Sequence, residues 1–353
     1  MERSLFDCFR LAAPRIGRLS VHIRHPFSLH LVNILLTDGR LPGLININVL
    51  YDDEENQVFD RYISLPLNGA SLRSISLTGV QTQPWCQFDL GNLTSLYLGT
   101  GERWKWLRSS IVPLLQASTS LQELHFVGDK GMFRTAMDEG FDGFHSTLPA
   151  LRRVRFVNTA PGFIFTFFRA VNTPLLEEVD MTAPSHRTHN NEGGEIFSWT
   201  TAVRSVLPGP AVSPSPKTLK LRDGDVKYNE KNAVHVLVFL AAVFPNITFL
   251  EIGGGLLLIL DALEQLATRQ RAGLPKPWFL ERLKVYRHVD QAVEGGHEDI
   301  GKSLTRTLRS LELAGVMSLK ELRLGIDRPI HLPVGTDSLD ALKELVGELI
   351  LDE

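Results

Sequence analysis

The hexapeptide Leu121-Gln122-Glu123-Leu124-His125-Phe126 follows the pattern L-x-x-L-x-Φ, in which Φ is an apolar residue. Apolar and polar residues alternate at its end, which is typical of a short strand with one buried face. The same pattern, with other apolar residues and once proline at its first position, occurs at twelve places: 16–21, 44–49, 72–77, 93–98, 121–126, 151–156, 176–181, 216–221, 247–252, 280–285, 319–324 and 346–351. The hexapeptides begin 21 to 40 residues apart, about 30 on average.

Between the hexapeptides the spacing of apolar residues changes to that of helices. The predicted helices span residues 27–36, 104–117, 162–171, 197–206, 231–244 and 257–271, and Pro113 is expected to kink or shorten the second. Strands that alternate with helices predict a parallel sheet with right-handed crossovers. A repeat of this length lies at or just beyond the leucine-rich repeat range of about 20–29 residues. We therefore predict an α/β leucine-rich repeat solenoid, a horseshoe of about twelve irregular repeats with strands on its concave face and helices on its convex face.

The segment around residue 308 fits two structures. Leu308-Arg309-Ser310-Leu311-Glu312-Leu313 matches the strand pattern, but the next match begins only 11 residues later, at Leu319. Ile300, Leu304, Leu308 and Leu311 also form a stripe at helical spacing. We predict a helix over residues 298–314, capped by Gly315, and a strand over 319–324.

The repeats predict one domain over residues 1–353. Leu5, Phe6, Phe9 and Leu11 indicate that residues 1–15 are the remnant of a helix before the first strand. Residues 182–217 are expected to be an insertion within one repeat, because the interval there is the longest and is rich in polar residues, glycine and proline.

Composition excludes several classes of protein. The 37 basic and 40 acidic residues give a net charge of −3, which gives no general attraction to nucleic acid or to an anionic membrane. Two cysteines exclude a disulfide scaffold and favour a reduced, intracellular setting. Charged residues at 2, 3, 7 and 10 argue against a signal peptide, and the most apolar stretch, residues 234–244, is too short to span a bilayer. We expect an intracellular protein, cytoplasmic or nuclear, without nucleic-acid or membrane partners.

Three segments resemble a known family: Leu41-Pro42-Gly43-Leu44, Leu148-Pro149-Ala150-Leu151 and Ser318-Leu319-Lys320-Glu321-Leu322-Arg323-Leu324. With the other repeats, over residues 16 to 351, they resemble the leucine-rich repeat region of F-box proteins, especially the large fungal group with irregular repeats. In that family an N-terminal F-box binds the Skp adaptor of a cullin ubiquitin ligase, and the repeats recruit a substrate. Residues 1–15 are too short for an F-box. The resemblance therefore implies a substrate-recognition region whose Skp partner requires an F-box upstream of this sequence. The alternative is a binding module or regulator without a ligase link.

The candidate binding residues are polar residues just before, between and directly after the last two apolar residues of each hexapeptide, positions that are expected to line the concave face. They are Tyr97, His125, Arg153, Arg155, Glu178, Asp180, Lys220, Arg222, Glu251, Lys284, Tyr286 and Arg323. Their charges largely alternate from strand to strand, and neighbouring strands lie about 4.8 Å apart. Two interpretations stay open: a ladder of charges that neutralise one another, or a protein-binding face with Tyr97, His125 and Tyr286 as anchors.

No catalytic signature stands out. Gly253-Gly254-Gly255 lacks the third glycine of a G-x-G-x-x-G phosphate cradle. His186 and His189 do not match a zinc-site spacing, and Cys8 and Cys86 are interpreted as structural thiols. We therefore expect no enzyme activity, no metal and no cofactor.

Overall fold

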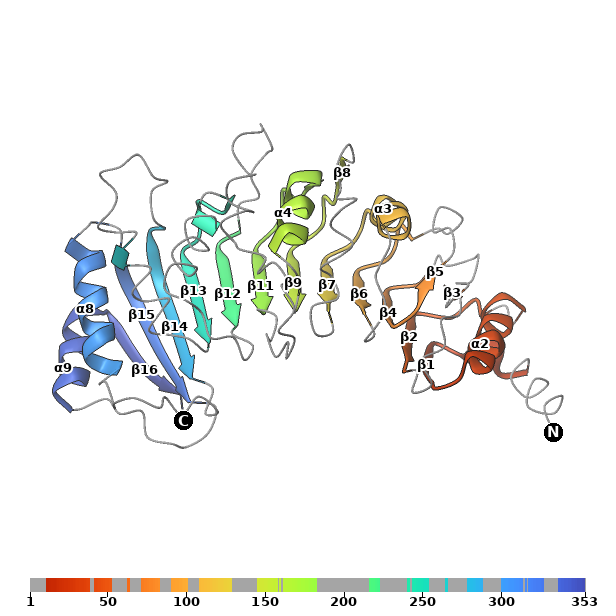
Figure 1. Cartoon of the computed structure of the whole chain (residues 1–353), viewed down its shortest axis with the longest axis horizontal. Helices are drawn as coiled ribbons and strands as arrows, with labels where there is room; N and C mark the ends of the chain where they lie inside the picture. The colour runs from red at the N-terminus through yellow and green to blue at the C-terminus, as the bar shows by residue number, and fades with distance from the viewer. Residues whose placement is uncertain are drawn as a thin grey trace, which may run out of the picture. The chain divides into compact units, whose positions relative to one another are not determined.

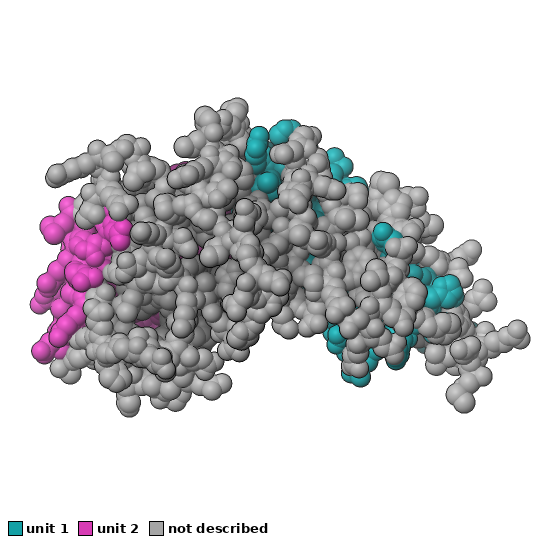
Figure 2. Space-filling view, viewed as in Figure 1, with its two compact units in different colours: residues 1–175 teal, residues 176–353 magenta. Residues whose placement is uncertain are grey.

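The computed structural model describes residues 11–38, 41–52, 62–63, 71–82, 90–100, 108–128, 145–157, 159, 161–182, 216–222, 240–241, 243–253, 264–265, 278–287, 300–313, 315, 317–326 and 336–352. The chain divides into two compact units, residues 1–175 and 176–353 (Figure 2). In the described residues each unit contains six main strands, all parallel to their neighbours, so the chain is an α/β protein. That it forms one domain remains a prediction.

The strands of the first unit lie side by side in chain order (Figure 1). They are β1 (Arg18–Ile23), β2 (Asn46–Tyr51), β4 (Ser74–Thr78), β6 (Ser95–Gly99), β7 (Glu123–Val127) and β9 (Arg153–Val157). The described helices of this unit are the 3-10 helix η1 (Ala13–Arg15), α2 (Pro26–Asp38), α3 (Arg108–Ala117) and α4 (Pro161–Ala170). Sequential parallel order with crossovers between neighbours is the arrangement of a single-wound array.

Two short parallel pairs of strands lie outside the main sheet in the same unit. The strand β3 (Tyr62–Ile63) pairs with β5 (Gln81–Thr82), and β8 (Ser146–Thr147) pairs with β10 (Val171–Asn172). None of these four strands was predicted, because two residues are too few to show a period in the sequence.

The second unit repeats the arrangement. Its main strands are β11 (Glu178–Thr182), β12 (Thr218–Arg222), β13 (Phe249–Gly253), β14 (Leu280–Arg287), β15 (Met317–Ile326) and β16 (Glu348–Asp352). Its long described helices are α8 (Ile300–Leu313) and α9 (Thr336–Leu345), which pack against each other, α8 also contacting β15 and α9 contacting β16 (Figure 1).

The strand register aligns the hexapeptides of neighbouring strands residue by residue. The middle apolar residues lie opposite one another: Ile47, Ile75, Leu96, Leu124 and Val154 in the first unit, and Val179, Leu219, Leu250, Leu283, Leu322 and Leu349 in the second. Nearly all of them are fully buried. All twelve predicted strands are therefore confirmed, and most of their apolar residues belong to the core.

A cluster of phenylalanines fills the core between β7, β9 and α4. Phe126 and Phe156 stack with ring centroids 5.6 Å apart, and Phe167 meets both rings edge-on at 5.7 Å. Phe163 lies 5.0 Å from Phe126, also edge-on. Because α4 covers the face that carries Phe126 and Phe156, the alternating side chains of β7 and β9 project from the opposite face. We call that opposite face of the main strands the polar face.

Several predicted helices are present, but the predicted positions of their ends were less accurate. The helices α2 and α4 match the predicted spans within one or two residues, whereas α3 is described from Arg108, and Pro113 lies inside it. Leu308–Leu313 belongs to α8, as predicted, and Gly315 follows it with φ +67°. Residues 240–241, 243 and 264–265 are helical, in agreement with two further predictions. The helix α9 was not predicted.

Several predicted features lie outside the described residues or only partly within them. The helix predicted over 197–206 and residues 183–215 of the expected insertion lie outside. Of the expected N-terminal helix, residues 11–15 are described, and they are helical.

Candidate functional site

The candidate residues lie on the polar face, in rows that follow the strand register. In the first unit Ser76, Tyr97, His125 and Arg155 occupy one row on β4, β6, β7 and β9. In the second unit Asp180, Lys220, Glu251, Lys284 and Arg323 occupy a row on β11 to β15. Eight of the twelve predicted residues therefore lie in these two rows, all of the named residues except Ser76. A ninth, Arg153, lies opposite Glu123 on β7.

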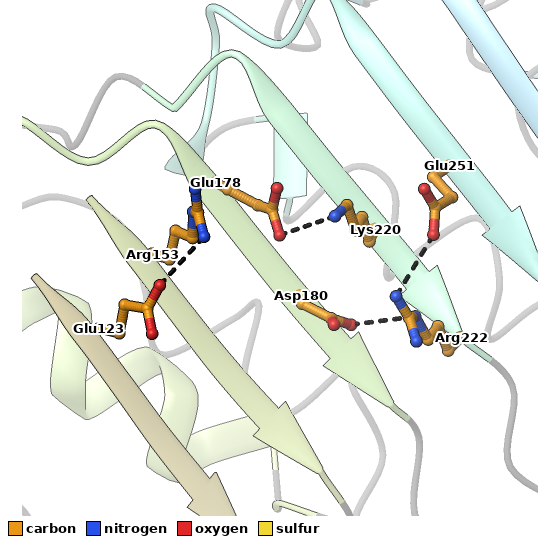
Figure 3. A network of polar contacts seen from close by, with 7 residues as sticks. All are labelled: Glu123, Arg153, Glu178, Asp180, Lys220, Arg222 and Glu251. Atoms are coloured by element: carbon orange, nitrogen blue, oxygen red, sulfur yellow. Dashed lines mark hydrogen bonds and ion pairs between the residues drawn. The ribbon is translucent and has the colours of Figure 1, made fainter. Parts of the chain in front are cut away.

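Ion pairs connect the first three strands of the second unit. Lys220 Nζ lies 2.8 Å from Glu178 Oε1, and Arg222 Nε lies 3.5 Å from Asp180 Oδ1. Nη2 of Arg222 is also 3.5 Å from Glu251 Oε1, so one guanidinium on β12 reaches carboxylates on both neighbouring strands (Figure 3). We call Glu178, Asp180, Lys220, Arg222 and Glu251 the charge cluster.

The two carboxylates beside Arg222 are nearly inaccessible to solvent. The side chain of Asp180 is 9% exposed and that of Glu251 is 10% exposed. A buried carboxylate is costly unless cations and hydrogen bonds compensate it. The cluster therefore contains three acidic and two basic groups, and the basic groups compensate part of the cost of burying the acids.

Burial raises the pKa of the Glu251 carboxyl above its ordinary value. The cations Lys220, Arg222 and Lys284 act in the opposite direction, and the negative charge of Asp180 adds to the increase. Since the pKa is raised despite three nearby cations, removal from water is the dominant cause.

Further along the second unit, an aromatic ring enters the polar face. The guanidinium carbon of Arg282 on β14 lies 4.7 Å from the ring centroid of Phe249 on β13, a cation–π contact. On β15, Arg323 pairs with Glu321, and Lys320 Nζ lies 3.1 Å from Glu281 Oε1. Phe249 was missed in the sequence, although its position directly before the middle apolar residue Leu250 could have indicated it.

The first unit has a more aromatic polar face. The rings of Tyr97 and His125 lie on adjacent strands with centroids 6.1 Å apart and planes tilted by 50°. Burial raises the pKa of the Tyr97 hydroxyl, while Arg155 and a hydrogen bond with the Thr78 side chain lower it. Arg153 Nη1 donates to Glu123 Oε1 at 3.0 Å, and both of these side chains are substantially exposed (Figure 3).

Some candidates cannot be placed. Tyr286 belongs to β14 by its backbone, but its side chain lies outside the described part of the chain. Cys8, Cys86, His186, His189 and the glycines at 254 and 255 also lie outside it. Among the described residues no three or more His, Cys, Asp or Glu side chains gather closely enough to hold a metal ion. No helix in the same residues has the length and apolar character needed to cross a membrane.

No family model matches the chain, and no curated protein is significantly similar to it.

The polar face of the first unit differs in chemistry from that of the second. In the second unit, the acids and bases of the charge cluster lie within ion-pair distance of one another. In the first unit, Tyr97 and His125 present half-buried rings beside an exposed ion pair. Aromatic and arginine side chains on a rigid, partly buried surface are what protein-binding hot spots are made of.

Proposed function

We propose that the chain is a leucine-rich repeat solenoid that binds another protein through its polar face, as the substrate-recognition region of an F-box-type ubiquitin ligase adaptor. The observation that carries the binding role is the pair of rings at Tyr97 and His125. They lie on adjacent parallel strands, and Ser76 and Arg155 flank them in register. Rigid strands hold such side chains in place before binding, which lowers the entropic cost of association. The charge cluster supplies fixed charges that select the partner rather than add much affinity.

The resemblance of the hexapeptides to F-box repeat regions supports the link to a ubiquitin ligase. In that family the Skp adaptor binds the F-box and not the repeats, so the ligase role requires an F-box in addition to residues 1–353. A stand-alone binding module with the same polar face is the alternative.

Two forms of the chain separate these functions. One is residues 1–353. The other is extended at its N-terminus by any residues encoded in frame before Met1. Each is mixed with purified Skp adaptor and analysed by size-exclusion chromatography. Co-elution of the extended form alone supports the ligase adaptor. If neither form co-elutes with the adaptor, the stand-alone module is the correct function.

Three single variants test the binding face. Tyr97→Ala and His125→Ala should each reduce capture of the proteins that the wild type retains from its own cell extract by 10-fold or more, which corresponds to about 1.4 kcal/mol. Phe279→Ala is the matched control, because Phe279 is an aromatic residue, 52% exposed, that lies outside the polar-face rows. Undiminished capture by both test variants would show that the rings do not contribute to binding.

A further inference from the structure

The last strand of the second unit leaves apolar surface exposed. The described strand that pairs with β16 is β15, and none pairs with the other edge of β16. Leu351 on β16 is 53% exposed, although its register partner Leu324 is 4% exposed. Leu349 is half-buried, whereas its partner Leu322 is completely buried. A strand edge that no described strand covers, with an exposed leucine on the strand, is a site at which another strand can add.

The first strand of the first unit has a matching edge. The described neighbour of β1 is β2, and the other edge of β1 has no strand in the described residues. Val21 is only partly buried, while Arg18, Ser20 and His22 are exposed. In β1 and in β16, a leucine or valine that is not fully buried therefore lies near exposed polar residues, which include Glu348 on β16.

The repeat itself defines how the two edges fit together. On β15 and β16 the third residues of the hexapeptides, Glu321 and Glu348, lie opposite each other. If a parallel β1 followed β16 in the same register, its own third residue, Arg18, would lie opposite Glu348. Leu19 would then meet Leu349, Ser20 would meet Ile350, and Val21 would meet Leu351.

Charge favours this pairing over the alternatives. Glu348 already has a like-charged neighbour, Glu321, on β15, and Arg18 would supply the opposite charge. Antiparallel pairing of two β16 strands about Ile350 puts Glu348 at the register position of Asp352, acid against acid. Antiparallel pairing of two β1 strands about Ser20 puts Arg18 against His22, so Arg18 gains no acidic partner there. Like charges directly opposite each other are destabilising.

We propose that β16 of one copy of this chain pairs in parallel with β1 of a second copy, so that the copies join head to tail. The contact is heterologous, since the two surfaces differ, and each added copy presents a new free edge. We expect assembly to continue beyond a dimer, as an open row of copies. This inference does not depend on the proposed function.

Sedimentation velocity of the full chain at low ionic strength, over roughly 1 to 200 µM, tests the proposal. The average mass should rise with concentration past that of a dimer. Arg18→Glu and Glu348→Arg should each weaken assembly by 10-fold or more, because each puts like charges in contact. The double variant Arg18→Glu/Glu348→Arg should restore it. Arg309→Glu, an exposed arginine on α8, is the matched control and should assemble as the wild type does.

A covalent test locates the contact. Ser20→Cys and Ile350→Cys, combined in a chain that carries Cys8→Ser and Cys86→Ser, place two thiols at opposing register positions. The spacing of adjacent strands lies within the range a disulfide can bridge. Oxidation should yield a ladder of covalent multimers from the double-cysteine chain, and no species above a dimer from either single-cysteine chain.

Three results would overturn the proposal. They are a monomer at every concentration without a covalent ladder, assembly that stops at a dimer, and assembly that is unaffected by either charge reversal. Circular dichroism of each variant establishes that it is folded. Leu351→Ser provides a second probe that removes an exposed side chain and should also weaken assembly.

Discussion

Arg222 Nε lies 3.5 Å from Oδ1 of Asp180 on the neighbouring strand, and the Asp180 side chain is 9% exposed. The same guanidinium lies 3.5 Å from the equally buried Glu251. Arg222→Ala removes a cation that both carboxylates share, and we expect it to lower the free energy of unfolding by about 1–3 kcal/mol. Urea denaturation followed by circular dichroism measures this change.

The exposed pair of Arg153 and Glu123 is the control for that prediction. Its side chains are 60% and 39% exposed, so water screens the charges, and Arg153→Ala should cost less than about 1 kcal/mol. If Arg153→Ala destabilised the protein as much as Arg222→Ala, burial of the charge cluster would not be the relevant difference.

The raised pKa of Glu251 predicts how stability depends on pH. A carboxyl whose pKa is higher in the folded state than in the unfolded state stabilises the protein fully below the unfolded pKa. That contribution is lost as the pH rises through the folded pKa. Glu251→Gln should therefore be more stable than the wild type at pH 7. The difference in stability should shrink as the pH falls to values at which the Glu251 carboxyl is protonated. Thermal denaturation of both proteins over this pH range tests the sign, and a less stable variant at pH 7 would contradict it.

The phenylalanine cluster should dominate the stability of the first unit. Phe167 is fully buried and meets Phe126 and Phe156 edge-on. Phe167→Ala is expected to cost about 3–5 kcal/mol, because it leaves a cavity between α4 and the strands. Amide hydrogen exchange should show the largest loss of protection in β7 and β9. A loss spread evenly over β11 to β16 would contradict the assignment of this core to the first unit.

Two glycines with nearly the same backbone conformation should respond differently to alanine. Gly79 and Gly315 have φ of 69° and 67°. A Cβ at Gly79 would lie 2.4 Å from the carbonyl oxygen of Tyr51, whereas a Cβ at Gly315 meets nothing within 4 Å. Gly315→Ala should cost about 1 kcal/mol for the left-handed conformation alone. Gly79→Ala should cost clearly more, and equal losses in urea denaturation would argue against the close approach to Tyr51.

The main strands were predictable because their signal is local. Each L-x-x-L-x-Φ hexapeptide contains its own alternation, and the register that aligns Leu124 with Leu96 and Val154 follows from repeating it. The helix α9 carries apolar residues at 339, 342 and 345 at helical spacing, but ten residues between two strands make a weak pattern.

The partners within the charge cluster were harder to predict than its location. Alternating signs indicated that charges would meet across strands. They could not show that Lys220 pairs with Glu178 rather than with its register partner Asp180. Long side chains reach the diagonal neighbour as easily as the direct one, and rotamers decide between them. The half-buried state of Tyr97 likewise depends on neighbours that are distant in sequence.

Connections of very different length join strands that keep the same register. Sixteen residues, 79–94, connect β4 to β6, and 35 residues, 183–217, connect β11 to β12, yet both pairs align residue for residue. The alignment of side chains on the two faces of the strands thus does not depend on the length of the connections between the strands. A foreign peptide inserted between Thr182 and Thr218 should therefore leave the polar face unchanged, which makes this connection the natural place to attach a label or a new binding sequence.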